Sequence, residues 1–395
     1  MIDKPGPTRV LWDATSLLGS RTGVGRYTGH VLTELARMAG AAESAAGPEP
    51  QSELDLVATA YTWRGREDLP AALPLGVAAV GRRAPARLLH ELWARVEIPR
   101  AAWLAGQFDV LHAPNFVLPP IGRAAGLVTV HDLGYLRVRE TVSTASARYR
   151  ELVPRSIRRA HLVLTPSRAI ADEVIDEYGL PADRVIPTPL GVDPAWFSIE
   201  PGRPVELPDR YLLFVGTVEP RKDLPGLLAA YRLLLDAEAN GPEVPPLVLV
   251  GPSGWGPALD LAGVPPERVR SLGYLEEQHL RPVLAAATAL CFPSLYEGFG
   301  LPPLEALAAG TPVVASDIAA VREVVGDLAG AAPTGSVRLV PPRDPVALSG
   351  ALTEVLSAPR PDPAAGRAHA AGFSWRATAE RTLVAYRRAL ELAHS

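Results

Sequence analysis

The sequence has few of the features that mark redox, secreted or membrane-spanning proteins. Its 395 residues include one cysteine, Cys291, which cannot form a disulfide within the chain. Cys291 lies in an apolar run, so we predict a buried, inert thiol rather than redox chemistry or a thiolate metal cluster. No stretch of 18 or more uninterrupted apolar residues occurs, and residues 1–20 lack the charged start and apolar run of a signal peptide. A transmembrane or secreted protein is therefore not expected.

Lysine is also scarce, and positive charge is not in excess. Of the 39 basic residues only Lys4 and Lys222 are lysines, and the net charge is −4. No nucleic-acid partner is expected, because such proteins carry a basic surplus. With 48% hydrophobic and 21% charged residues the composition is that of a globular protein, and the length suggests two domains. Lys222 stands out as the internal lysine of an arginine-rich chain.

Apolar runs alternate with helical patterns along most of the chain, which is typical of βαβ units and a parallel sheet. In the first half we expect strands at 9–14, 54–60, 109–113, 126–131 and 161–165 and helices at 24–38, 86–104, 147–159 and 168–178. In the second half we expect strands at 211–218, 246–251, 289–294 and 312–316 and helices at 224–239, 277–287 and 302–309. The proline-rich and glycine-rich stretch 186–210 between them predicts a domain boundary.

The loop from Glu297 to Glu305 is the strongest candidate site, because ligands of open parallel sheets bind beyond the carboxyl ends of the strands. We expect Glu297 on the loop and Glu305 in the first turn of the next helix. Gly298 and Gly300 let the backbone approach a ligand, the helix N-terminus favours a phosphate, and the carboxylates accept hydrogen bonds from sugar hydroxyls. The alternative is that Glu305 only complements the helix dipole and Glu297 is solvated.

A second loop, Glu219-Pro-Arg221-Lys222-Asp223, places two cations between a buried strand and a helix for which Asp223 is a plausible N-cap. An arginine fork and a lysine point charge are suited to neutralising a diphosphate whose charge grows as it leaves. A solvated basic turn is the alternative.

A third loop, residues 18–28, carries Gly23 and Gly25 into a helix. A dinucleotide loop with the spacing GxGxxG would need glycine at Thr28, and no GK[ST] follows to form a P-loop. A simple tight turn is equally compatible with this pattern.

His131 ends an expected strand, where it would hydrogen-bond a substrate or handle a proton near neutral pH. A structural role is the alternative, and it is favoured for His112 at the end of the neighbouring strand.

Together these segments resemble the retaining glycosyltransferases of family four, whose GT-B fold has two Rossmann-like domains facing a central cleft. The most specific segment, PSLYEGFGLPPLEALAAGTPVVAS, is similar to the E-x7-E region of that family at Glu297 and Glu305. VGTVEPRKDL, LVLVGPSGWG and IPTPLGVDP also resemble it. The resemblance implies an α/β fold of two doubly wound parallel-sheet domains. It implies an acceptor domain at 1–195, joined by a crossover helix at about 373–395, and a nucleotide-sugar donor domain at 205–372.

The resemblance also implies residue roles. Arg221 and Lys222 would carry the diphosphate, Glu297 would hold the donor sugar, and His131 would lie beside the transferred sugar, which makes these four the catalytic candidates. Glu305 would hold the ribose, and the other donor-binding candidates are Gly298, Phe299, Gly300, Leu301, Gly216, Gly23 and Gly25. Thr217 departs from the family, many members of which have arginine there, so the phosphate contact rests more on Arg221.

The implied activity is retaining transfer of a hexose, with GDP-mannose as the first donor to test, to a glycan or lipid-linked acceptor, without a metal or other cofactor. A double displacement needs a carboxylate nucleophile that we cannot assign. The resemblance therefore implies a same-face reaction in which the leaving phosphate helps deprotonate the acceptor. The alternatives are a UDP-sugar hexosyl or N-acetylhexosaminyl transferase, a catalytically silent nucleotide-sugar binding protein, and a dehydrogenase, whose glycine spacing fails at Thr28.

The N-terminal half is basic although the whole chain is not. Residues 82–100 have a net charge of +3 and residues 137–159 one of +5. A helix over 82–100 would place on one face Leu88, Leu89, Leu92, Trp93 and Val96. Such a surface would attract anionic lipids, so we expect a cytoplasmic protein with a peripheral contact at the inner face of the membrane. The alternative is a core-facing helix with a solvated basic face.

Overall fold

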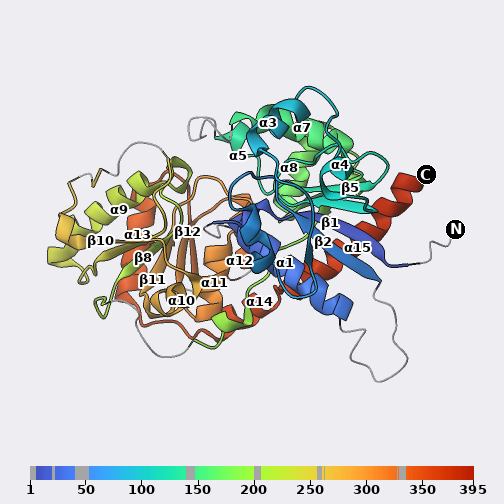
Figure 1. Cartoon of the computed structure of the whole chain (residues 1–395). Helices are drawn as coiled ribbons and strands as arrows, with labels where there is room; N and C mark the ends of the chain where they lie inside the picture. Colours follow the sequence, from blue (N-terminus) through green and yellow to red (C-terminus); the bar gives the residue numbers. More distant parts are fainter. Residues whose placement is uncertain are drawn as a thin grey trace, which may run out of the picture. The chain divides into compact units, whose positions relative to one another are not determined.

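The computed structural model describes residues 6–19, 23–40, 53–138, 147–199, 206–255, 260–261, 263–326, 328 and 335–395. Contacts between residues divide the chain into two compact units (Figure 1). Unit 1 holds the described residues of Met1–Tyr135, Thr144–Gly191 and Trp375–Ser395. Unit 2 holds those of Leu136–Ser143 and Val192–Ser374. Lys4 lies outside the described residues.

Unit 1 is built on a seven-stranded parallel sheet with the order β3-β2-β1-β4-β5-β6-β7. Its strands are β1 (Thr8–Asp13), β2 (Leu54–Thr59), β3 (Ala78–Ala79), β4 (Val110–Ala113), β5 (Ala125–Thr129), β6 (Leu162–Thr165) and β7 (Val185–Pro187). The inner strands β4, β5 and β6 are buried along their whole length, as expected for apolar runs covered on both faces. The five strands predicted in this half are confirmed to within two residues.

The helices of unit 1 flank this sheet. They are α1 (Gly23–Gly40), α2 (Leu69–Ala72), α3 (Ala86–Trp93), α4 (Ala101–Ala105), α5 (Gly134–Arg137), α7 (Tyr149–Arg159), α8 (Arg168–Tyr178) and α15 (Trp375–His394). The single helix predicted at 86–104 is wrong, because α3 and α4 are separate. Pro99 explains the break: it has no N–H to donate and disfavours helical backbone at Ile98 before it.

The C-terminal helix α15 belongs to unit 1, where it lies beside α1 and against β4 and β5 (Figure 1). A hydrogen-bonded chain ties it to the sheet: Nδ1 of His112 bonds the hydroxyl of Tyr386 at 2.8 Å, and Nε2 bonds Oγ1 of Thr129 at 2.8 Å. Burial lowers the pKa of His112 to about 3, so the ring is neutral. His112 is thus a core histidine, as predicted.

Unit 2 is built on a six-stranded parallel sheet with the order β10-β9-β8-β11-β12-β13. Its strands are β8 (Leu212–Val215), β9 (Leu247–Val250), β10 (Val269–Gly273), β11 (Ala289–Phe292), β12 (Val313–Ser316) and β13 (Val337–Val340). Its helices are α9 (Leu224–Ala237), α10 (Glu277–Ala286), α11 (Leu301–Ala309), α12 (Ala319–Val325), α13 (Pro345–Ser357) and α14 (Ala364–Ala371). Cys291 lies in the core, which confirms the predicted burial, and burial raises the pKa of its thiol to about 12.

Each sheet has a point where the strand order reverses, and this determines where ligands reach it. In unit 1 the chain moves from β1 to one side through β2 and β3 and then to the other side through β4. In unit 2, β8 lies between β9 and β11 in the same way. Loops that leave neighbouring strands in opposite directions open a crevice at such a point, so a ligand is expected beside the loops after β1, β4, β8 and β11.

Within the described residues, no helix combines the length and apolar character needed to cross a membrane.

The contact between α15 and the sheet generates a first prediction. Tyr386→Phe leaves Nδ1 of His112 without its partner in the core, so we expect the free energy of unfolding in urea to fall by about 1–3 kcal/mol. Tyr274→Phe is the matched control, because its ring is 45% exposed; we expect a change within about 0.5 kcal/mol. Equal effects of the two variants would contradict a structural role for the His112–Tyr386 bond.

Candidate active site

The loops after β8 and β11 meet through side chains at the switch point of unit 2. Nζ of Lys222 donates to Oε1 of Glu297 at 2.5 Å, and Nη1 of Arg221 lies 3.3 Å from Oε2 of the same carboxylate. Arg221 also donates to the carbonyl of Tyr296 at 3.2 Å, and its own carbonyl accepts the N–H of Leu295 at 2.9 Å. Side chains 75 residues apart in the sequence thus form one polar cluster.

Local structure explains how the two cations come to this position. After β8 the chain forms one turn of 3-10 helix, η6 (Pro220–Lys222), begun by a proline in its first turn. Asp223 follows with φ of 49° and accepts the N–H of Gly226 at 3.2 Å, which confirms it as the N-cap of α9. The turn and the cap together hold Arg221 and Lys222 at the end of β8.

Burial and charge determine the state of Glu297. Its side chain is 9% exposed, and burial by itself would raise its pKa. The positive charges of Lys222 and Arg221, with the hydrogen bond from Lys222, outweigh burial and leave the pKa lowered. Glu297 is therefore a carboxylate at neutral pH. The alternative that Glu297 is solvated is wrong, and so is a solvated turn at Lys222, whose side chain is 11% exposed.

Glu219 completes the cluster, and sequence reasoning did not assign it a role. Its Oε1 accepts from Nε and Nη2 of Arg221 at 3.1 and 2.9 Å. The fork of Arg221 thus lies between the carboxylates of Glu219 and Glu297. The sequence does place Glu219 close to the two cations, because it precedes them in the same loop. It was not predicted as a site residue, because a carboxylate is not expected to bind a diphosphate.

Gly216, a predicted donor-binding residue, lies beside Lys222: a Cβ built on it would meet Cε of Lys222 at 3.5 Å. Its N–H donates to the carbonyl of Val250 at 2.9 Å. The loop after β9 approaches so closely that a Cβ at Gly251 would lie 1.9 Å from the carbonyl oxygen of Gly216. Only glycine fits at Gly251, where φ is +147°, so the loops after β8 and β9 support each other.

The N-terminus of α11 differs from the expectation in two ways. The helix begins at Leu301 and has no acidic residue in its first turn, so Glu305 falls in the second turn. Its exposure of 1% makes it a buried carboxylate rather than a surface charge that complements the helix dipole. Pro302 and Pro303 have no N–H, so the first turn offers fewer donors than an ordinary helix end.

Backbone donors remain just before α11. Phe299 and Gly300 donate their N–H groups to no other group in the described part of the chain. Gly300 caps the helix with φ of 120°, a conformation that favours glycine. These two N–H groups, with Gly298 and Leu301 on either side, are the donors that this loop offers to an anion or a sugar oxygen.

In unit 1, His131 follows β5, and its Nε2 bonds the carbonyl of Pro114 at 2.6 Å. A carbonyl only accepts, so Nε2 carries the proton and Nδ1 presents a lone pair. Burial lowers the pKa of His131, so the ring is neutral at pH 7. The rings of Tyr27 and Phe116 lie edge-on to it at 5.1 and 5.8 Å. His131 is thus held in one tautomer as a hydrogen-bond acceptor.

The glycine loop of unit 1 is described only in part. Gly23 begins α1 at the surface and Gly25, two residues later in the first turn, is buried, while residues 20–22 lie outside the described residues. Gly23 and Gly25 therefore lie at the N-terminus of α1, as predicted. Among the described residues, no three His, Cys, Asp or Glu side chains are grouped as metal ligands.

Known protein families match both halves of the chain. Residues 209–358 match the family described as "Glycosyl transferases group 1", and residues 21–196 match "Glycosyltransferase Family 4". The chain is 34% identical over 324 residues to the O-antigen chain mannosyltransferase B of Escherichia coli, covering 78% of this chain and 81% of that protein. It is also 34% identical over 320 residues to a D-inositol 3-phosphate glycosyltransferase of Kineococcus radiotolerans, covering 73% of this chain and 70% of the relative.

The fold is similar to that of the sucrose-phosphate synthase of Thermosynechococcus elongatus, with a TM-score of 0.65 at 20% identity over 97% of this chain and 98% of that one. The two parallel-sheet α/β domains of this chain have the GT-B fold. Together with the identity to the two relatives, this shows that the chain is a glycosyltransferase and belongs to family four.

Proposed function

We propose that the chain is a retaining, metal-independent glycosyltransferase that moves a hexose from a nucleotide diphosphate sugar to a glycan or lipid-linked acceptor. The observation that carries the proposal is the buried cluster of Arg221, Lys222 and Glu297 at the switch point of unit 2. GDP-mannose is the proposed donor, and it rests on the mannosyltransferase name of the Escherichia coli relative. We propose unit 2 as the donor domain and unit 1, with α15, as the acceptor domain.

The cluster is suited to stabilising a leaving diphosphate. The bond between the anomeric carbon and the phosphate oxygen breaks, the acceptor oxygen bonds to the same face of that carbon, and the acceptor proton passes to the phosphate oxygen. Arg221 and Lys222 lie in place before the reaction, so they stabilise the charge that gathers on the phosphate without reorganising. In other transferases a bound metal ion stabilises the charge of the leaving phosphate, and here the two side-chain cations would do so.

Glu297 and His131 are proposed to hold the sugar. Both oxygens of Glu297 face the cations, so the carboxylate orients Lys222 and accepts hydrogen bonds from sugar hydroxyls with its remaining lone pairs. Nδ1 of His131 presents a lone pair and would accept from a hydroxyl of the transferred sugar. Glu305 is proposed to accept the ribose hydroxyls.

Two other functions would use the same site. A UDP-sugar hexosyl or N-acetylhexosaminyl transferase would bind the donor diphosphate with the same cluster, and its donor would carry uracil in place of guanine. A catalytically silent protein would bind the donor without turning it over.

Nucleotide titration tests the donor class. Calorimetry of the whole chain with GDP, UDP, ADP and NAD, without divalent metal, should show selective binding of GDP, because the cationic pair holds the diphosphate and the proposed donor is GDP-mannose. Selectivity for UDP or ADP would replace the donor and keep the rest of the proposal. Binding of NAD alone, or of no nucleotide, would contradict the assigned site.

Lys222→Ala tests the phosphate role. Removing a charge that stabilises the leaving group should lower kcat for sugar transfer or donor hydrolysis by about 100-fold or more. Arg232→Ala, on the exposed face of α9, is the control and should leave kcat unchanged. Thermal unfolding of both variants distinguishes a catalytic role of Lys222 from a structural one. If Lys222→Ala loses as much free energy of unfolding as it loses in transition-state stabilisation, Lys222 is a structural residue.

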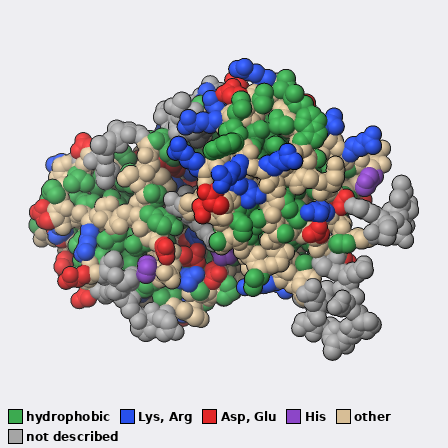
Figure 2. All heavy atoms as spheres, viewed as in Figure 1, with side chains coloured by type: hydrophobic (Ala, Val, Ile, Leu, Met, Phe, Trp, Pro, Cys, Tyr) green, Lys and Arg blue, Asp and Glu red, His purple; other side chains and the backbone are tan. Residues whose placement is uncertain are grey.

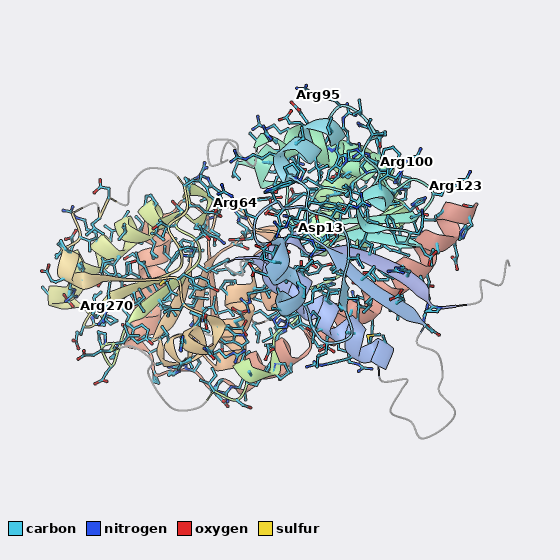
Figure 3. The ribbon with its side chains drawn as sticks, in the orientation of Figure 1. Asp13, Arg64, Arg95, Arg100, Arg123 and Arg270 are labelled. Atoms are coloured by element: carbon cyan, nitrogen blue, oxygen red, sulfur yellow. The ribbon has the colours of Figure 1, made fainter. Side chains whose placement is uncertain are left out.

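We also propose a peripheral membrane contact through unit 1. Leu88, Val96, Ile98 and Trp103 are all exposed within sixteen residues of sequence, with Trp103 at 61%. Leu89 and Trp93 are instead buried, so the predicted apolar face is wrong in part. Figure 2 shows hydrophobic side chains gathered among basic ones over α3, and Figure 3 shows Arg95, Arg100 and Arg123 on the same side of unit 1. Exposed apolar groups ringed by arginines are complementary to an anionic lipid surface.

The membrane contact has its own test. The chain should sediment with vesicles of phosphatidylcholine and phosphatidylglycerol and stay in solution with phosphatidylcholine alone. Replacing both Ile98 and Trp103 by serine should weaken binding about tenfold, because burial of the two side chains supplies the apolar part of the affinity. Val384→Ser removes an equally exposed apolar side chain from α15 of the same unit and serves as the control. No sedimentation of the unmodified chain, or equal loss in the control, would contradict the contact.

A further inference from the structure

A second polar cluster, to which no role has been assigned, lies at the switch point of unit 1. Asp13 is the last residue of β1 (Figure 3), and Tyr61 comes two residues after β2, the neighbouring strand. Thr15 links them: its hydroxyl donates to Oδ1 of Asp13 at 2.5 Å and accepts the N–H of Tyr61 at 2.9 Å. The three residues form one unit where the strand order reverses.

One oxygen of the Asp13 carboxylate has no partner among the described residues. Oδ1 accepts both the N–H and the hydroxyl of Thr15, at 3.0 and 2.5 Å. Oδ2 accepts no hydrogen bond from any described residue, and no described arginine or lysine forms an ion pair with Asp13. Burial raises the pKa of Asp13, with the bonds from Thr15 acting against it. A partly enclosed carboxylate oxygen is thus left to accept a hydrogen bond from outside the chain.

The hydroxyl of Tyr61 is a second unused group at the same place. The side chain is 3% exposed, and its oxygen is buried with no hydrogen-bond partner in the part of the chain that the structure describes. Burial first, and then the charge of Asp13, raise the pKa of Tyr61 well above its usual value, so the hydroxyl and the carboxylate lie within electrostatic reach. Buried hydroxyls are nearly always bonded, so an orphan beside a free carboxylate oxygen indicates a missing ligand.

Tyr149 and Asp132 also lie near Asp13. Tyr149 lies in α7, and burial first, then the charges of Asp132 and Asp13, raise the pKa of its hydroxyl. Tyr149 is thus also within electrostatic reach of Asp13. The cluster presents one carboxylate acceptor and tyrosine hydroxyls, and Asp132 adds a second negative charge, so it suits a neutral hydroxylated molecule and repels an anion.

We infer that Asp13, Tyr61 and Thr15 form a binding site for the hydroxyl groups of a neutral polyol acceptor. Oδ2 of Asp13 accepts a hydrogen bond from one acceptor hydroxyl, and the hydroxyl of Tyr61 donates to an oxygen of the same molecule. The inference rests on the proposed transferase function and deepens it, because it assigns the acceptor's hydroxylated end to this site. A phosphate or lipid diphosphate on the acceptor would lie away from Asp13.

Binding of small polyols tests the inference without knowledge of the natural acceptor. The whole chain is saturated with GDP, and binding of methyl α-D-mannopyranoside and of myo-inositol is measured by ligand-observed NMR. We expect at least one of them to bind. Asp13→Asn should weaken that binding about tenfold, because the amide nitrogen that replaces Oδ2 donates and cannot accept, while Oδ1 keeps its bonds from Thr15.

Matched variants keep the result interpretable. Asp55→Asn makes the same change on a half-exposed carboxylate of β2 and should not alter polyol binding. Tyr61→Phe should weaken polyol binding about fivefold while leaving the thermal midpoint unchanged or higher, because it removes a buried hydroxyl that has no partner. A lower midpoint would show that the hydroxyl has a structural role and would overturn its assignment.

Donor binding separates this inference from the proposed function. If GDP binds but neither polyol does, or if Asp13→Asn and Tyr61→Phe bind the polyol as the unmodified chain does, the acceptor site is refuted and the donor site stands. If none of GDP, UDP and ADP binds to the unmodified chain, the proposed function fails, whatever the polyol result; if UDP or ADP binds instead of GDP, the polyol measurement is made with that nucleotide.

Discussion

The buried ion pair between Lys222 and Glu297 is the interaction on which the arrangement of unit 2 depends. It joins the loop after β8 to the loop after β11, and Arg221 shares the same carboxylate. Removing one member of such a pair leaves an unpaired charge in a buried place, whereas the intact pair adds little net stability. Its main effect is thus positional: it holds the two cations of the loop after β8 against the loop after β11.

The alternation of apolar runs and helical patterns was sufficient to predict the parallel sheets, because strands buried on both faces are read directly from their composition. The two-residue and three-residue strands β3 and β7 could not be predicted, since such short segments carry no pattern. The break between α3 and α4 was missed because the apolar spacing on either side of Pro99 remains helical. Glu305 was placed one turn early, since the exact start of α11 depends on the conformation of Gly300, which spacing alone does not determine.

The two histidines at the ends of neighbouring strands show why the site was harder to predict than the fold. In the sequence His112 and His131 are alike, each following an apolar run. In the structure both ring nitrogens of His112 are occupied, one by Tyr386 from a helix 274 residues later, while His131 uses only one. The difference depends on partners that are distant in sequence. The same is true of Asp13, whose significance comes from the unpartnered hydroxyl of Tyr61.

Pro302 and Pro303 have a consequence beyond the donors that they remove. Each proline ring restricts the backbone of the unfolded chain as well as that of the helix, so forming the first turn of α11 loses less conformational entropy. The turn is consequently less prone to fray, and the buried Glu305 follows directly after it. The chain thus gives up hydrogen-bonding capacity at this helix end and gains a preorganised carboxylate one turn further on.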